Sequence, residues 1–587
     1  MLFKQIFSKT KFPFKSLIII SIGIIILVFS FSVRADRLRE TLNFFVDPSR
    51  DLENRSQISA SLQQITTRIY FYAEDNWWDS LDYKKQNQVR QSLLSLGNEF
   101  YYKIYPEITS TFGEEWSPGI DEKNRITVLI HQMKGDNGGY FRNNDEYSKL
   151  QLPTSNEREM IYLNARYVEN PLLKSLLSHE FIHLVTFNQK EKKQNIEEEV
   201  WLNEARAEYA PTFLGYDDQY QDSNLQNRVK IFLNSPSDPI TEWQGEKADY
   251  GALNLFTQYL VEHYGIGILA DSLKSNKVGI DSINGALEKS NFNKTFSQIF
   301  TDWTIALLVN DCSLEEKYCY KNENLKDLRI NPQLLFLPFN GQSNLDITQN
   351  VKDWSAIWLK IIGGGKGSLK IKFINNSAVP FEIPYIFKDI SGKYSINFLK
   401  LDKYQQKEVS ISDFNTKVYS VTFIPLLKNK KSGFLNPEPS FSFSISASVV
   451  KETEQEKEFS KYLEKPISEM SKEELQTKIN TLEELITLLK ESLKNQQLSC
   501  QKFEYNLFYG QRNNNEVKCL QSFLKDQGTD IYPEGLVTGN FLSLTKAAVI
   551  RFQEKYASEI LKPLDLGEGT GFFGLRSRAK VNELLGT

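Results

Sequence analysis

Two of the four histidines in this chain, His179 and His183, stand four residues apart, and Glu180 directly follows the first. Leucine, phenylalanine and valine recur at helical spacing through residues 172–185, just after Pro171, a residue that favours the first turn of a helix. The pattern predicts one mostly buried helix. Side chains four residues apart share a helix face, so both imidazole rings point at one spot. Buried polar groups need partners, and a zinc ion would satisfy this set.

A second motif follows on the next predicted helix. A catalytic zinc ion takes three protein ligands and keeps one position for water. The segment Trp201-Leu-Asn-Glu204 resembles the Asn-Glu motif that gluzincin metallopeptidases pair with HExxH; this group includes thermolysin and the zinc aminopeptidases. The resemblance implies an α+β zincin-type metallopeptidase domain, a Zn²⁺ cofactor, and Glu204 as the third ligand beside His179 and His183. The alternative for Glu204 is a solvated helix carboxylate.

Three further side chains have expected roles. Glu180 lies next to the first histidine and can take a proton from water on the metal. Glu208 is one helical turn beyond the expected third ligand, so we expect it to orient His179; a surface charge is the alternative. Tyr250 resembles the tyrosine that the aminopeptidase branch uses to stabilise an oxyanion. For Tyr250 the alternative is a core tyrosine, and His263 is the other candidate donor.

Two buried strands are predicted ahead of the histidine motif, at residues 125–131 and 159–164. Gly138-Gly139-Tyr140-Phe141 lies between them, and this order of strand, glycine-tyrosine loop, strand and HExxH resembles the secreted hyicolysin-like peptidases. In gluzincins an edge strand above the zinc helix pairs with the substrate backbone. We therefore expect region 138–147 or its neighbour to bind substrate. His131 is expected in the core or at a strand edge, and it is not assigned to the metal.

The composition and the N-terminus indicate export. The 587 residues are 40% hydrophobic and 25% charged with a net charge of −4, which argues against nucleic acid as the main partner. Four lysines precede an uncharged run at residues 16–33, so residues 1–35 are predicted to be a signal peptide or a signal anchor. Either outcome places residues 36–587 outside the cytoplasm. Four cysteines fit that location; three pairings are possible, and we predict Cys312–Cys319 and Cys500–Cys519.

The pattern along the chain predicts several domains. Residues 36–325 form the predicted metallopeptidase domain, and helical periodicity at residues 62–70 and 89–101 indicates helices near its start. Residues 330–449 alternate between polar and apolar side chains, which predicts an all-β, sandwich-like domain. Residues 450–498 are charged and helix-forming, which favours a stiff helical linker or a short coiled coil.

Residues 500–587 carry a second resemblance. The segments Glu516-Val-Lys-Cys-Leu-Gln521, Thr538-Gly539, Ala548-Val-Ile-Arg-Phe552-Gln553 and Thr570-Gly571 resemble the peptidoglycan-binding domain of bacterial wall hydrolases, a small three-helix module. One departure is Leu542, where that family often has glycine before a helix, which predicts an altered turn. Gln521, Phe552 and Gln553 are core candidates as much as ligand-binding ones.

Together these features predict an exported bacterial zinc metallopeptidase, held at the cell wall by its last domain. We expect protein or peptide substrates and an endopeptidase rather than an aminopeptidase. The partners implied are peptidoglycan and, if the N-terminal segment is uncleaved, the membrane. One alternative is a zinc peptidase that cuts peptidoglycan peptides. Another is a catalytically inactive, wall-binding surface protein.

Overall fold

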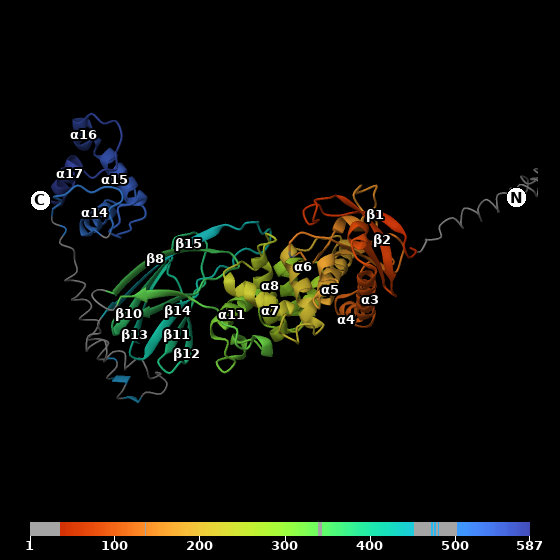
Figure 1. Cartoon of the computed structure of the whole chain (residues 1–587). Helices are drawn as coiled ribbons and strands as arrows, with labels where there is room; N and C mark the ends of the chain where they lie inside the picture. Colours follow the sequence, from red (N-terminus) through yellow and green to blue (C-terminus); the bar gives the residue numbers. More distant parts are fainter. Residues whose placement is uncertain are drawn as a thin grey trace, which may run out of the picture. The chain divides into compact units, whose positions relative to one another are not determined.

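The computed structural model describes residues 36–135, 137–338, 343–450, 500, 502–512 and 514–586, with a few positions between 471 and 479. Contacts divide the chain into two compact units, Met1–Glu452 and Thr453–Thr587. The first unit holds an α+β module (residues 36–330) and an all-β module (residues 331–450), and the second holds a helical C-terminal module (Figure 1). The prediction of a multidomain chain that mixes helices and sheets is confirmed.

A six-stranded mixed sheet opens the α+β module, in the order β1-β2-β3-β4-β6-β5. Strands β3, β4 and β6 run parallel, whereas β5 pairs antiparallel with β6 at one edge. Every residue of β3, β4 and β6 is buried, as expected for central strands that are covered on both faces. The six strands are β1 (Thr41–Phe45), β2 (Gln57–Ile65), β3 (Ile69–Glu74), β4 (Ile126–His131), β5 (Gly139–Phe141) and β6 (Met160–Asn164).

The helix predicted over residues 62–70 is wrong, because this segment forms the β2–β3 hairpin. Its leucine and isoleucines fit a spacing of three to four residues. Burial instead alternates along the first part of β2, where Ile58, Ala60 and Leu62 all face one core. The isoleucine, tyrosines and phenylalanine of β3 favour a strand because such side chains pack well on a pleated surface.

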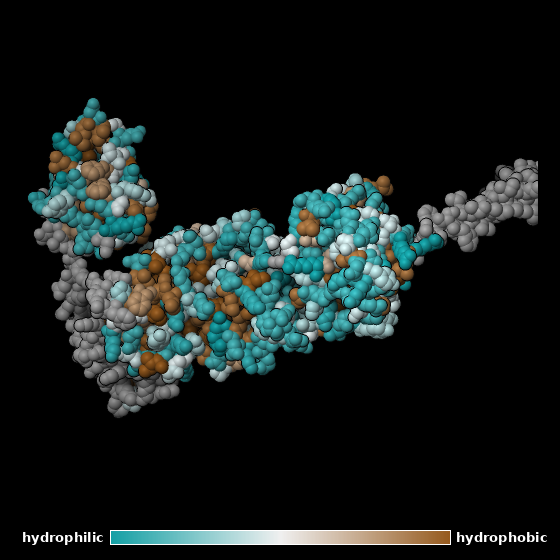
Figure 2. Space-filling model, in the orientation of Figure 1, coloured by the Kyte–Doolittle hydropathy of each residue, from teal (hydrophilic) through white to brown (hydrophobic). Residues whose placement is uncertain are grey.

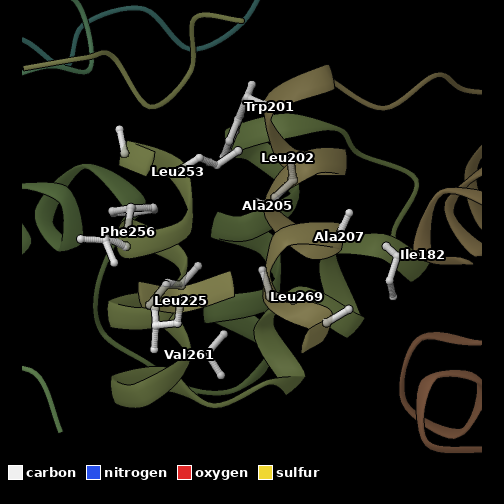
Figure 3. Close-up of a cluster of buried hydrophobic side chains, with 14 of the residues drawn as sticks. Ile182, Trp201, Leu202, Ala205, Ala207, Leu225, Leu253, Phe256, Val261 and Leu269 are labelled. Carbon is white, nitrogen blue, oxygen red and sulfur yellow. The ribbon is translucent and has the colours of Figure 1, made fainter. Parts of the chain in front are cut away.

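Helices cover one face of this sheet and continue beyond it. Helix α5 (Leu173–Thr186) packs against β5 and β6, and α6 (Val200–Phe213) packs against α5. The periodicity predicted at residues 89–101 is confirmed by α3 and the π turn that follows it. Figure 3 shows apolar side chains from several of these helices meeting in one core. The other helices are α2 (Asp75–Asp79), α3 (Tyr83–Glu99), α4 (Tyr105–Phe112), α7 (Asn224–Asn234), α8 (Lys247–Tyr264), α9 (Gly267–Lys274), α10 (Gly279–Lys289) and α11 (Phe296–Val309).

The all-β module is a single nine-stranded sheet, which confirms the all-β prediction. The nine strands share one hydrogen-bonded network around one apolar core. In that network β13 and β14 are linked by a single residue pair, Phe414 and Val418, so the sandwich-like arrangement stays a prediction. The main path is β12-β11-β14-β13-β10-β15-β8, with β9 paired to β14 and β7 paired to β9. The strands are β7 (Gln333–Leu337), β8 (Ser343–Lys352), β9 (Leu359–Gly363), β10 (Gly367–Asn375), β11 (Pro384–Asp389), β12 (Tyr394–Phe398), β13 (Gln406–Phe414), β14 (Val418–Phe423) and β15 (Ser440–Val450).

The described residues of the C-terminal module form three longer α-helices and one short one: α14 (Asn515–Asp526), α15 (Ser543–Lys555), α17 (Leu575–Leu585) and α16 (Ala557–Ile560). Gln521 and Gln553 are buried, and each side-chain oxygen accepts hydrogen bonds from the backbone of a Thr-Gly turn. These glutamines therefore hold the turns in place. Leu542 has an extended backbone, as Gly574 does at the matching helix start, so the position does not need glycine. The altered turn relative to the resembled family stays a prediction.

Both predicted disulfides, Cys312–Cys319 and Cys500–Cys519, are present. Disulfides persist in oxidising compartments, so they indicate an extracytoplasmic protein. Within the described ranges, no helix has the length and apolar character needed to cross a membrane. The predicted signal segment at residues 1–35 and nearly all of the predicted linker at residues 450–498 lie outside the described residues.

Candidate functional site

Helix α5 brings the two histidines together. His179 and His183 lie one turn apart, and their Nε2 atoms approach to 3.3 Å. The helix is fixed because Phe181, on another face, packs edge-on against Phe100 at 4.9 Å between ring centroids. The apolar positions of α5 thus anchor it in the core, while its two imidazole rings turn towards α6.

Helix α6 brings Glu204 to the same place. One carboxylate oxygen lies 3.4 Å from His179 Nε2, and the other lies 3.8 Å from His183 Nε2. Two small side chains of α6, those of Ala205 and Ala207, are buried in the apolar core between the helices and let neighbouring helices approach closely (Figure 3). The sequence-predicted ligand set therefore converges, although its residues come from two helices.

The outer nitrogens of both rings also face oxygen atoms. His179 Nδ1 lies 3.4 Å from Glu208 Oε1, and His183 Nδ1 lies 3.1 Å from Asn203 Oδ1. A ring N–H directed at each oxygen would fix the tautomer and leave both Nε2 atoms as lone pairs that face inwards. The sequence signal for Asn203 is its place in the Asn-Glu motif, but its contact with His183 was not predicted.

This arrangement fits a divalent metal ion. Two inward Nε2 lone pairs and the Glu204 carboxylate would repel one another without a cation between them. Glu204 Oε2 is buried and has no hydrogen-bond partner. Burial opposes a charge on His179, but Glu204 and Glu208 outweigh burial and raise its pKa well above the ordinary value. A place with that much negative potential also attracts a metal cation, and nitrogen and oxygen ligands suit zinc.

Glu180 occupies the side of the site that faces the sheet edge. It is buried, and a Cβ atom placed on Gly139 of β5 would come within 3.1 Å of its Oε1. Burial raises the pKa of Glu180, even though His179 and His183 act to lower it. Ligand atoms of Glu180 and both histidines lie within 4.8 Å of one another, so distance alone allows Glu180 as a ligand. The Glu204 oxygens face both Nε2 atoms, which makes Glu204 the better third ligand.

Arg228, which the sequence analysis did not predict, contacts Glu208 behind the two histidines. Arg228 of α7 donates from Nε and Nη2 to the two oxygens of Glu208, each at 2.7 Å. Burial alone would raise the pKa of Glu208, but Arg228 and His179 outweigh it and hold that pKa far below the usual range. Glu208 is therefore an ionised acceptor for His179. No sequence motif marks Arg228, because its role depends on the tertiary packing that places α7 within reach of Glu208.

Tyr250 lies in the first turn of α8, at the border of this group. The Arg228 guanidinium carbon lies 4.6 Å from the centre of the Tyr250 ring. Burial, together with the charges of Glu204 and Glu208, raises the pKa of Tyr250, so its hydroxyl stays protonated and can donate. Tyr250 is partly exposed, in contrast to a fully buried core tyrosine.

The other two histidines lie elsewhere. His131 is buried at the end of β4, with Nε2 3.2 Å from the Tyr140 hydroxyl. His263 is in the last turn of α8, the helix that also carries Tyr250, and its Nε2 lies 2.9 Å from the Cys319 carbonyl oxygen. Because Tyr250 is in the first turn of the same helix, His263 lies almost a helix length from the site.

Comparisons with known proteins add no functional assignment. No protein-family model and no curated protein matches the chain. Among solved structures, the matches include the mitogen derived from Yersinia pseudotuberculosis, with 13% identity over 19% of this chain and 91% of that one, at a TM-score of 0.14. They also include the pre-peptidase C-terminal domain of a Bacillus anthracis collagenase, with 9% identity over 20% of this chain and 94% of that one, also at a TM-score of 0.14. Scores this low carry no argument.

Proposed function

We propose that the chain is an exported zinc metallopeptidase that hydrolyses peptide bonds and is attached to the bacterial cell wall by its C-terminal module. One observation carries the catalytic part: His179, His183 and Glu204 converge with their polar atoms facing inwards, and Glu204 Oε2 is buried without a partner. The α+β module, with β5 at the sheet edge beside α5, fits the zincin-type domain that the motifs resemble.

A zinc ion held by these ligands would polarise the scissile carbonyl and lower the pKa of a water molecule. Glu180, buried beside Gly139, accepts a proton during the attack and passes it to the leaving amine. Tyr250 donates a hydrogen bond to the developing oxyanion. Strand β5 is outermost in its sheet, so its backbone can pair with an extended substrate beside α5. An endopeptidase binds an internal segment of a longer chain, and an edge strand can hold such a segment in the extended conformation.

The wall-binding part of the proposal concerns the C-terminal module. Phe508, Tyr509 and Phe572 are 49%, 58% and 45% exposed, and hydrophobic residues are visible on the surface of this module in Figure 2. The rings of Phe508 and Phe572 are stacked with centroids 6.4 Å apart. Exposed aromatic rings offer flat apolar faces with low conformational freedom, which suits sugar rings. Cosedimentation of the full chain with purified peptidoglycan tests this part, and a triple alanine variant should stay in the supernatant.

The catalytic part is tested by Glu180→Gln in the chain of residues 36–587. The variant should bind one equivalent of zinc, like the parent, and lose more than about 99% of its hydrolysis of a peptide library, because general-base catalysis contributes about 10²–10⁴-fold. Glu323→Gln is the matched control, since Glu323 is 86% exposed and pairs with Lys326 at the surface. Equal cleavage by Glu180→Gln and the parent would refute the mechanism. Release of muropeptides instead of peptides would favour peptidoglycan as the substrate.

A further inference from the structure

The loop between α7 and α8, residues 235–246, connects the candidate site to the all-β module. On its site side, Trp243 packs edge-on against Tyr250, with ring centroids 4.8 Å apart. Tyr250 in turn lies against Arg228, which holds Glu208 beside His179. A continuous series of side-chain contacts thus runs from His179 through Glu208, Arg228 and Tyr250 to Trp243.

The other side of this loop is held by the all-β module. Lys352, the last residue of β8, donates to both oxygens of Glu242 at 2.7 and 2.9 Å. The backbone N–H of Glu438 donates to the same carboxylate at 2.8 Å. Asn436 Oδ1 accepts from the backbone N–H of Trp243, also at 2.8 Å. Glu242 is 1% exposed, so this is a buried, charge-assisted attachment.

The two modules meet through buried aromatic side chains, not through a flexible tether. Trp354 of the all-β module is fully buried, and its ring centroid lies 4.9 Å from that of Phe296 on α11. Its backbone carbonyl also accepts from the N–H of Ile240 in the loop, at 3.0 Å. Trp358 donates through Nε1 to the carbonyl of Thr304 at 2.9 Å. Large buried aromatic contacts make a docked arrangement that can hold a loop in one position.

We propose that the all-β module is a positioning element of the active site: the Glu242–Lys352 pair fixes the 235–246 loop, and through it Trp243 and Tyr250 beside the zinc ligands. This inference rests on the proposed peptidase function. Trp243 and Tyr250 are both partly exposed, so they form a surface that a substrate side chain can contact. Glu242 and Lys352 act through these two aromatic residues and are positioning residues.

The test compares two lysines that attach the all-β module at different places. Lys352→Met removes the two hydrogen bonds of the Lys352–Glu242 ion pair from the attachment of the loop. Lys428→Met removes contacts with the Ser297 carbonyl, at 3.2 Å, and with Thr301 Oγ1, at 2.9 Å, on α11. In the 36–587 chain, Lys352→Met should lower kcat/KM about 10-fold with unchanged zinc content, because small displacements at a site are costly. Lys352→Arg should recover most of the loss, and Lys428→Met should stay within about 2-fold of the parent.

A second measurement and a second variant test the positioning role of Lys352 further. Amide hydrogen exchange of residues 236–250 should become faster in Lys352→Met and stay unchanged in Lys428→Met. If Lys352→Met does not fold, Asn436→Ala removes a single acceptor from the Trp243 backbone and should produce the same changes to a smaller extent. An active parent whose kcat/KM is unaffected by Lys352→Met, or equally reduced by Lys428→Met, overturns the positioning role alone. A parent without zinc-dependent hydrolysis defeats the proposed function instead.

Discussion

Replacing Glu208 with alanine should lower the free energy of unfolding of the metal-free protein by about 3 kcal/mol, because it leaves a charged guanidinium without its partner. Arg228 makes two hydrogen bonds of 2.7 Å to Glu208, which is 1% exposed, and Asn254 donates to the same carboxylate at 3.3 Å. Removing one partner of a buried ion pair typically lowers the free energy of unfolding by about 3–5 kcal/mol. Arg228 itself is 17% exposed, so water recovers part of the loss and the lower end is expected.

The same substitution should weaken zinc binding about 10–100-fold, because His179 loses the acceptor that orients its ring. Urea unfolding in the presence of chelator, followed by near-ultraviolet circular dichroism, separates stability from metal binding. Zinc affinity is measured by competition with a coloured chelator. The double variant Glu208→Ala, Arg228→Met should regain much of the stability but not the zinc affinity. A stability change below about 1 kcal/mol, with unchanged zinc affinity, would refute this account of Glu208.

Two further predictions concern other parts of the chain. Burial raises the pKa of Glu159 to about 7, so the folded chain keeps a proton that the unfolded chain releases near pH 4.5. The free energy of unfolding should therefore fall by roughly 2 kcal/mol between about pH 5 and about pH 8. Glu159→Gln should flatten that slope in denaturant titrations. In the C-terminal module, Gln521→Ala should cost about 3 kcal/mol, because it leaves the N–H groups of Thr538 and Gly539 without an acceptor. Hydrogen exchange at residues 536–546 checks this, and unchanged protection would contradict it.

Local patterns predicted the parts of the site that depend on helix periodicity. The spacing of His179 and His183 fixes a shared helix face, and Glu204 and Glu208 share a face on the next helix for the same reason. Arg228 and Trp243 could not be found in this way, because their partners are set by how α7 and α8 pack. The contact between Trp243 and Asn436 joins residues 193 positions apart, and no local pattern encodes it.

At residues 62–70, in β2 and β3, the local pattern predicted the wrong secondary structure. Leucine and isoleucine at a spacing of three to four residues fit a helix, but the same residues also fit a strand that is buried on both faces over part of its length. Tertiary pairing decided the outcome: β2 pairs with β1 on one side and with β3 on the other, so its backbone polar groups find partners in both neighbouring strands. Single-sequence periodicity does not include that pairing.

We propose that His179, His183 and Glu204 bind one zinc ion, on which the peptidase function depends. Zinc X-ray absorption spectroscopy of the 36–587 chain, beside Glu204→Gln and the exposed control Glu323→Gln, tests it most directly. The claim predicts one zinc ion per chain, two imidazole nitrogens at about 2.0–2.1 Å and oxygen ligands at about 2.0–2.2 Å. Glu204→Gln should lose most of its zinc, and the control should keep it. A parent that binds no zinc, or a Glu204→Gln variant with an unchanged spectrum, would contradict the claim.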